Sequence, residues 1–184
     1  RVARGEAIAA FALSEPDAGS DVAALSCAAR AEGTHYVLDG EKTWISNGGI
    51  ADFYTVFART GEAPGARGLS AFLLPADTPG LTVVRDLTVF GYTDQEGHCE
   101  LSFEDVRVPR SNLIGEEGRG FDLMGQWLGA TRLAVAANAV GRAQRVLEEA
   151  LSWAVSREQF GQPIGRFQGL SFQPADPALE TEAA

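Results

Sequence analysis

The period of the hydrophobic pattern changes once along the chain, near Gly118, and this change separates two parts that must fold differently. Before it, from Ile8 to Val108, short β-prone runs alternate with turn residues, which is typical of an antiparallel barrel or sandwich. After it, apolar residues recur at spacings of three and four, which indicates one long amphipathic helix. The sequence therefore predicts an α+β fold, in which an antiparallel β-barrel or sandwich is followed by a long helix with an apolar face that needs a helical partner.

The first part of the chain holds six runs that we expect to form strands. They are residues 35–38, 42–45, 53–58, 69–74, 81–84 and 99–103. Asp39–Gly40 separates the first two runs, and this pair favours a type I′ turn because both central residues of such a turn need positive φ. We therefore predict a β-hairpin at Asp39–Gly40. Val108–Pro109 ends the β-rich part, so the expected domains are residues 1–109 and 110–184.

The second part is rich in alanine between Ala134 and Ala143, which makes one stretch of the expected helix narrow and suited to packing closely against another helix. A second helix is expected to begin near Gly165. Pro174 and Pro177 interrupt it, because an interior proline removes a hydrogen bond and clashes with the preceding turn, at a cost of about 3 kcal/mol. We expect the end of the chain to fray.

Composition and charge narrow the class of function. A formal net charge of -10 with scattered Lys and Arg argues against a nucleic-acid surface, and no apolar run approaches the roughly 18 residues that a membrane span needs. Cys27 and Cys99 are far apart and lack metal-ligand spacing, so we expect free thiols and no metal site. His35 and His98 each follow a turn, and both are expected at the surface. These features predict a cytoplasmic protein that neither spans a membrane nor binds nucleic acid.

Two segments combine small, hydroxyl and aromatic residues in a way that suits a flat ring and a phosphate. Residues 12–21 read Ala-Leu-Ser-Glu-Pro-Asp-Ala-Gly-Ser-Asp, where a strand end, a proline turn and a glycine place a hydroxyl beside backbone N–H groups. Residues 42–48, Lys-Thr-Trp-Ile-Ser-Asn-Gly, put an aromatic side chain before a hydroxyl and a turn. The residues alone leave a simpler interpretation open for each segment: a capped turn for the first, and a core tryptophan for the second.

In this order and at this separation, the two segments resemble the flavin-binding middle domain of the acyl-CoA dehydrogenase family. The resemblance covers nearly the whole chain and continues through residues 103–109, 115–121, 131–132 and 157–168, where it reaches the start of the family's C-terminal helical domain. It implies the family's fold, an antiparallel β-barrel-like domain followed by the first helices of an all-α bundle, and the family's cofactor, FAD, bound between the two domains. The positions that the resemblance assigns to FAD are Phe11, Leu13, Ser14, Gly19, Ser20, Trp44, Ile45, Ser46, Arg157, Phe160 and Gln168.

The resemblance also gives several of these residues a role. Ser46 matches a position near N5 of the flavin, where a donor helps the ring to accept hydride. Arg157 and Phe160 match residues that contact FAD, often that of a neighbouring subunit, and the arginine fork suits phosphate oxygens. Ser20 and Arg132 match positions near the acyl-CoA. Because an arginine among apolar helix residues is costly to bury alone, we expect an anion or an aspartate beside Arg132.

The activity implied by the resemblance is oxidation of an acyl-CoA thioester to the trans-2-enoyl-CoA, as in fatty-acid β-oxidation, by a homotetramer or homodimer that passes electrons to an electron-transfer flavoprotein. Thr131 stands where a minority of the family carries its catalytic glutamate, and Gly129 where an aspartate is frequent. We therefore assign no catalytic residue and expect an incomplete fragment without the base, located in the cytoplasm, or in the mitochondrial matrix of a eukaryote. Two alternatives stay open: a related flavin-dependent oxidase or monooxygenase, and a non-enzymatic truncated remnant.

Overall fold

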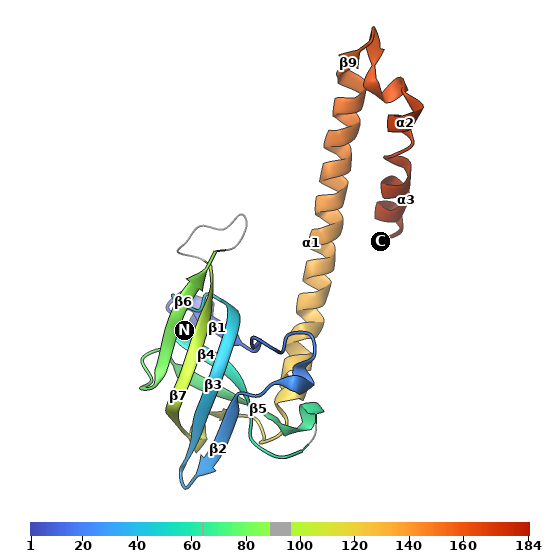
Figure 1. The fold of residues 1–184 in the computed structure, drawn as a ribbon. Helices are drawn as coiled ribbons and strands as arrows, with labels where there is room; N and C mark the ends of the chain where they lie inside the picture. Colours follow the sequence, from blue (N-terminus) through green and yellow to red (C-terminus); the bar gives the residue numbers. More distant parts are fainter. Residues whose placement is uncertain (64, 89–96) are drawn as a thin grey trace. The chain divides into compact units, whose positions relative to one another are not determined.

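The computed structural model describes residues 1–63, 65–88 and 97–184. The chain forms two compact units, Arg1–Gly125 and Gln126–Ala184, which are described separately (Figure 1). Within the described residues, none of the helices combines the length and the apolar character needed to cross a bilayer.

The first unit is built on one eight-stranded sheet. Its strands are β1 (Ala9–Ala12), β2 (Ala28–Glu32), β3 (His35–Ser46), β4 (Phe53–Arg59), β5 (Leu69–Pro75), β6 (Leu81–Leu87), β7 (His98–Pro109) and β8 (Leu113–Ile114). The order is β6-β7-β3-β2-β4-β5-β8, and β1 pairs with β4 outside this path. Most pairs are antiparallel, but β1 and β2 each pair with β4 in parallel. The α+β class is confirmed, and the sheet is mixed.

Alternation of side chains along the strands fills the core of this unit. In the first half of β7, Cys99, Leu101 and Phe103 are buried, and the residues between them are half-buried. The largest fully buried side chains of the unit include Tyr36, Tyr54, Phe57, Phe72, Phe103, Leu38, Ile45, Leu74 and Leu101. Each apolar side chain of this size that leaves water contributes about 1.5–3 kcal/mol, so the sheet carries most of the burial that stabilises the protein.

The predicted hairpin at Asp39–Gly40 is wrong, because β3 runs through both residues as one strand. The register between β3 and β7 shifts between Leu38 and Gly40, and Gly40 has a φ of 143°. A Cβ at Gly40 would lie 2.8 Å from the Cα of Cys27, so the glycine serves close packing of two backbones. The turn that joins β2 to β3 lies earlier, where Gly33 has a φ of 56°.

The long helix is confirmed as α1 (Gly120–Ser156), which continues from the first unit into the second. A short hairpin follows, formed by β9 (Glu158–Gln159) and β10 (Gln162–Pro163), and then α2 (Gln168–Ser171) and α3 (Ala175–Ala183). The prolines do interrupt the helix after α2, as expected. A further helix still forms after the interruption, because Pro174 precedes α3 and Pro177 lies in its first turn, where no N–H has an intrahelical partner.

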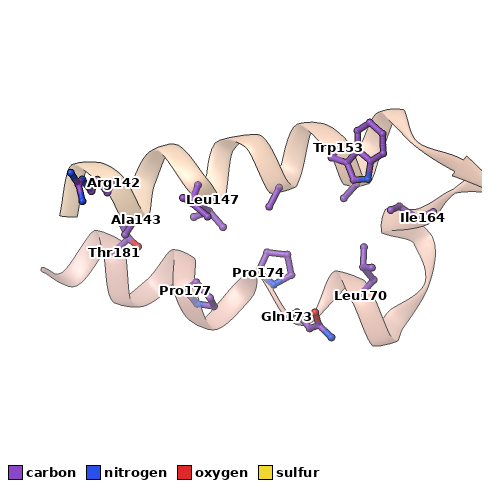
Figure 2. A pocket seen from close by; sticks show the side chains of 13 residues that line it. Arg142, Ala143, Leu147, Trp153, Ile164, Leu170, Gln173, Pro174, Pro177 and Thr181 are labelled. Carbon is purple, nitrogen blue, oxygen red and sulfur yellow. The ribbon is translucent and has the colours of Figure 1, made fainter. Parts of the chain in front are cut away.

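The second unit buries little of its apolar surface. Of its residues 126–184, all of which the structure describes, only Ala154 is buried. A groove of about 600 Å³ runs between α1 on one side and α2 and α3 on the other. Figure 2 shows Leu147 of α1 on one side of this groove and Pro174 and Pro177 on the other.

Candidate cofactor-binding site

The structure brings the two sequence segments together. The Thr43 N–H donates to the carbonyl of Ser14 at 2.9 Å, and Nζ of Lys42 donates to the carbonyl of Leu13 at 2.8 Å. The first segment therefore lies directly against β3, although about thirty residues separate the two in the sequence.

Alternation along β3 decides which side chains of the second segment are accessible. Trp44 is 56% exposed and Ser46 is exposed, whereas Ile45 between them is 1% exposed and packs in the core. The indole of Trp44 and the hydroxyl of Ser46 thus share one open face of the sheet. Ile45 has only its backbone to offer to a group bound on that face.

Trp44 has an unusual backbone conformation for its size. Its φ is 59°, in the left-handed region, and the register of β3 against β7 shifts between Lys42 and Ile45 around it. A bulky residue with positive φ costs roughly 1–2 kcal/mol. This conformation places a large apolar ring in solvent, and strained residues that the surrounding structure holds in place cluster at functional sites.

Phe11 lies on β1, and Leu13 lies in the segment directly after it. The Phe11 ring packs on that of Phe57 with a centroid distance of 4.9 Å and an interplanar angle of 53°. Leu13 is half-buried and packs against a small cluster of buried side chains that includes Leu25 and Leu69. Both residues present part of their apolar surface at the edge of the core.

Gly19 and Ser20 follow a tight turn. Glu15 and Ala18 close that turn with reciprocal backbone hydrogen bonds of 2.8 and 3.1 Å. Gly19 and Ser20 are exposed, and no heavy atom lies within 4 Å of the place where a Cβ of Gly19 would be. This part of the loop leaves its backbone accessible to a ligand.

A buried ion pair that the sequence did not reveal holds the two segments in place. Nζ of Lys42 lies 2.8 Å from Oε1 of Glu15, and the side chains are 0% and 3% exposed. The Glu15 carboxylate also accepts hydrogen bonds from the N–H and hydroxyl of Ser26 at 2.7 and 2.9 Å, and from the N–H of Cys27 at 3.0 Å. One carboxylate therefore ties the first segment to β3 and to the residues directly before β2.

The ionisation of this pair follows from its surroundings. Burial alone would raise the pKa of Glu15, but the charge of Lys42 and the hydrogen bonds from Lys42, Ser26 and Cys27 outweigh it, and the pKa is lowered. The carboxylate is thus held in its charged form. It is engaged on all sides, and it has a structural role at this site.

Three predicted cofactor residues gather at the hairpin of the second unit. The Phe160 ring is 93% exposed, with a φ of 54°, and lies edge-on to Phe167 at a centroid distance of 6.1 Å. The carbonyl of Arg157 accepts a hydrogen bond from the N–H of Ile164 at 2.8 Å, which closes the hairpin and leaves the Arg157 side chain exposed. Gln168 begins α2 immediately after Phe167.

Arg132 lies on α1, where its side chain is exposed. The expected aspartate beside it is not present, since its guanidinium forms no ion pair with any residue that the structure describes. Because the Arg132 side chain is exposed, its charge stays hydrated and needs no partner to compensate for desolvation. At the neighbouring position, the Thr131 hydroxyl donates to the carbonyl of Trp127 at 3.1 Å, a bond within the helix.

His98 lies closer to the site than its sequence position suggested. It is half-buried at the start of β7, its Nε2 is 3.2 Å from Oγ of Ser46, and its ring centroid is 6.2 Å from that of Trp44. Ser46 and His98 are 52 positions apart and meet only because β3 and β7 pair. No local pattern in the sequence could have indicated this contact.

The thiols and the acidic groups offer no metal site in the described residues, where no three His, Cys, Asp or Glu side chains are grouped to hold an ion. Cys27 and Cys99 are free and buried, as expected of unpaired thiols. Burial raises the pKa of each thiol to about 11, so both are protonated near neutral pH.

Comparison with known proteins identifies the family. Residues 10–106 match the acyl-CoA dehydrogenase middle domain, and residues 118–184 match the acyl-CoA dehydrogenase C-terminal domain. An acyl-CoA dehydrogenase of Bacillus subtilis is 42% identical over the whole chain, which covers 48% of that protein. The rat protein named short-chain specific acyl-CoA dehydrogenase, mitochondrial, is 43% identical over 98% of the chain and 43% of its own length.

Solved structures agree with the sequence comparison. The structure described as the FAD complex of PigA has a TM-score of 0.89 and 36% identity, and the match covers 97% of this chain and 46% of that one. The chain spans about half the length of the curated relatives it matches. The likeness extends over both units of the chain, and it places the chain in the acyl-CoA dehydrogenase family, a family of FAD-dependent oxidoreductases.

Proposed function

We propose that this chain supplies the flavin-binding part of an acyl-CoA dehydrogenase, which converts an acyl-CoA thioester to the trans-2-enoyl-CoA with FAD as cofactor. The observation that carries the proposal is the open face of β3, where the strained, exposed ring of Trp44 lies beside the hydroxyl of Ser46. The buried pair of Glu15 and Lys42 fixes the adjoining segment against this face. Family membership supplies the reaction class.

The residues of this face fit a flavin. A flat heteroaromatic ring needs an apolar surface to lie against and a few hydrogen-bonding groups at its edge. Trp44 offers the surface, and the hydroxyls of Ser46 and Ser14 offer the polar groups. FAD, when bound, supplies the hydride acceptor of the reaction. The role of Ser46 is to donate a hydrogen bond at N5, which stabilises the charge that develops there.

The remaining assigned residues would complete the site. Phe11 and Leu13 would contribute apolar surface, and the accessible backbone at Gly19 and Ser20 would contact phosphate groups. Arg157, Phe160 and Gln168 would contact FAD from the second unit, where all three are exposed. Their exposure supports this role because nothing within the unit uses the side chains of Arg157 and Gln168. Ser20 and Arg132 would contact the acyl-CoA.

The resemblance assigns the base to none of the acids in this chain, and two acids that lie near the candidate site are already engaged. Glu15 is buried and held charged by Lys42, and Glu117 accepts a hydrogen bond of 2.5 Å from the hydroxyl of Tyr36. A base must reach the α-proton of the thioester with a free carboxylate, and neither of these groups is free. We therefore name no catalytic residue among the described residues of this chain.

The proposal extends to partners and location. Reduced flavin would be reoxidised by an electron-transfer flavoprotein, and the complete enzyme would be a homotetramer or homodimer, since in this family residues such as Arg157 reach the FAD of a neighbouring subunit. The location would be the cytoplasm, or the mitochondrial matrix in a eukaryote; the name of the rat relative describes that protein as mitochondrial.

The test compares the 184-residue chain with a chimera in which it replaces the matching region of the Bacillus subtilis relative. With FAD, a panel of saturated acyl-CoAs and an artificial electron acceptor, we expect weak FAD binding and no turnover by the chain, and tight FAD binding and turnover by the chimera. A chimera that folds but binds no FAD would show a non-enzymatic remnant. Rapid oxygen consumption by the reduced chimera would instead indicate an oxidase.

A further inference from the structure

His98 contacts the two exposed side chains of β3 that form the candidate flavin surface. In the sheet it stands opposite Ser46 on one side and opposite Leu87 of β6 on the other. Its Nε2 lies 3.2 Å from Oγ of Ser46, and its ring meets that of Trp44 edge-on at an interplanar angle of 69°. A half-buried imidazole therefore supports both the aromatic ring and the hydroxyl of the open face.

The direction of the hydrogen bond between His98 and Ser46 decides what the hydroxyl can do. A serine hydroxyl has one hydrogen to donate and two lone pairs, and Nε2 of an imidazole either donates or accepts. If Nε2 accepts, the only hydrogen of Ser46 is consumed by His98. If Nε2 carries a hydrogen, Oγ of Ser46 accepts it, and the serine hydrogen is free to point toward the open face.

We propose that His98 is a positioning residue of the flavin site: its Nε2–H donates to Oγ of Ser46 and directs the serine hydrogen toward N5 of FAD. This inference rests on the proposed function, because it assumes a flavin on the open face. It adds a requirement that the cofactor assignment lacks, namely that Ser46 is an effective donor only while His98 holds its hydroxyl in one orientation.

The first measurement tests the hydrogen bond on the chain without cofactor. The chain contains only two histidines, so ¹⁵N-histidine spectra of the imidazole nitrogens resolve both. We expect Nε2 of His98 to be protonated, and we expect Ser46→Ala to move the signals of His98 but not those of His35. Thr34→Ala is the matched control, because the Thr34 hydroxyl lies 2.9 Å from Nδ1 of His35 and its loss should move the signals of His35 alone.

The second measurement tests the role toward the cofactor. The chain is titrated with FAD labelled with ¹⁵N at N5, and the N5 shift is extrapolated to saturation. A hydrogen bond to N5 moves this resonance upfield, so His98→Leu should move it downfield, part of the way to its position in Ser46→Ala. His98→Gln, whose amide can donate to Ser46, should restore the wild-type position, and the double variant His98→Leu, Ser46→Ala should shift it no further than Ser46→Ala alone.

The outcomes separate this inference from the function on which it rests. If neither the chain nor the chimera binds FAD, the proposed function fails and the role of His98 falls with it; if only the chimera binds FAD, the same variants are measured in the chimera. If FAD binds, and Ser46→Ala moves the N5 resonance but His98→Leu does not, the cofactor site stands and His98 is only a cross-strand neighbour. A deprotonated Nε2 in the first measurement would also overturn the inference. Unchanged His35 signals and circular dichroism show that each variant is folded.

Discussion

A lysine ammonium is strongly hydrated in water, yet Lys42 has replaced that water by a carboxylate and a backbone carbonyl. Its side chain is 0% exposed, and the two partners at 2.8 Å, Glu15 and the carbonyl of Leu13, compensate its charge and use two of its three hydrogens. Such a pair is costly to desolvate, so its net contribution to stability is small while both members are present. The loss of one member alone is strongly destabilising, because the remaining charge is then buried without a partner.

Lys42→Met should therefore lower the free energy of unfolding of the β-domain by about 3–5 kcal/mol, because it leaves Glu15 charged and buried without its partner. Adding Glu15→Gln to Lys42→Met should recover part of this loss. Urea unfolding followed by circular dichroism measures both. The control is Arg4→Ala, which removes an exposed ion pair with Glu6 and should cost less than about 1 kcal/mol. If Lys42→Met and Arg4→Ala lowered the free energy of unfolding equally, burial would not be what makes the Glu15–Lys42 pair important.

The same carboxylate predicts a pH dependence of stability. The pKa of Glu15 is lowered in the folded protein, so its contribution is fully present above the unfolded pKa, near 4.5, and is lost as the pH falls through the lower folded value. Urea midpoints of the wild type should fall as the pH is lowered from that value. In Glu15→Gln, the urea midpoint at neutral pH should be lower than in the wild type, and it should decrease less as the pH is lowered. Arg85 also lowers the pKa of Glu100, but solvent screens this surface pair, so Glu100→Gln should make the fall only slightly shallower.

Arg132 tests the substrate side of the proposed function. In the chimera, Arg132→Ala should weaken acyl-CoA binding by about 1.5–3 kcal/mol, roughly 10- to 150-fold, because a charge-assisted contact is lost, and should leave FAD affinity unchanged. Isothermal titration with a non-reactive acyl-CoA analogue measures the change. The matched control is Arg145→Ala on the same helix, whose guanidinium already pairs with Glu148 and Glu149. If both variants bind like the parent, Arg132 is an ordinary surface arginine.

At the scale of the element, the bulge in β3 combines an irregular backbone with an exposed aromatic ring. Trp44 keeps a left-handed φ because the residues on either side, Thr43 and Ile45, are buried and fix the path of the strand. The strain is thus stored by the flanking packing, and the element is less stable than a regular strand would be. This gives a prediction that separates backbone strain from side-chain contacts.

Trp44→Gly should be more stable than Trp44→Ala by about 1 kcal/mol, since glycine adopts the left-handed conformation without the Cβ penalty. Both variants lose the ring, so the difference between them reports only on the backbone. Glu41, an exposed position of the same strand without positive φ, is the control, and there the alanine variant should be the more stable. The same order at both positions, measured by urea unfolding, would show that Trp44 is not strained.

Elements could be predicted from the sequence where a local pattern determines them. The period of three and four beyond Gly118 gave α1, and the β-prone runs gave the main strands, because each pattern reflects one face of one element. The Asp39–Gly40 signal failed because the glycine is required by contact with Cys27, a tertiary reason that a turn signal does not distinguish. The parallel pairing of β1 with β4 likewise depends on partners distant in sequence.

The candidate site likewise has a part that could be predicted from the sequence and a part that could not. Leu13, Ser14, Trp44 and Ser46 were found through the resemblance of two continuous segments to a known family, and the structure brings those segments together. Two contacts were missed: the link between the segments through Lys42 and Glu15, and the contact of Ser46 with His98 of β7. Each link joins residues that occupy unremarkable sequence positions and become neighbours only when the sheet forms.

At the scale of the whole molecule, the two units differ in how they are stabilised. The first has a continuous core of buried apolar residues, whereas the second, residues 126–184, buries only Ala154 among its residues. Helices in proteins owe most of their stability to packing of an apolar face, and isolated ones are marginal in water. The second unit should therefore open without the first.

Hydrogen exchange followed by mass spectrometry should show this difference. We expect amides of β3, β4 and β5 to exchange only through global unfolding, and amides of α1 beyond Gln126 to exchange much faster through local opening. In the Lys42→Met variant, amides of the strands should exchange faster, and amides of the helix should exchange at the wild-type rate. Equal protection of β4 and of residues 130–150 would mean that the helix is covered by contacts other than those within its unit.

The buried pair of Glu15 and Lys42 also bears on how long the folded sheet survives. Water is excluded from the pair only when three separate segments are all in place: the turn after β1, the residues directly before β2, and β3 itself. In a partly folded sheet, water still reaches both charges. We therefore expect the pair to form after the transition state of folding and to break early in unfolding. Its loss should therefore shorten the lifetime of the native state while leaving the rate of its formation nearly unchanged. The buried pair thus slows the unfolding of the surface that the flavin would occupy.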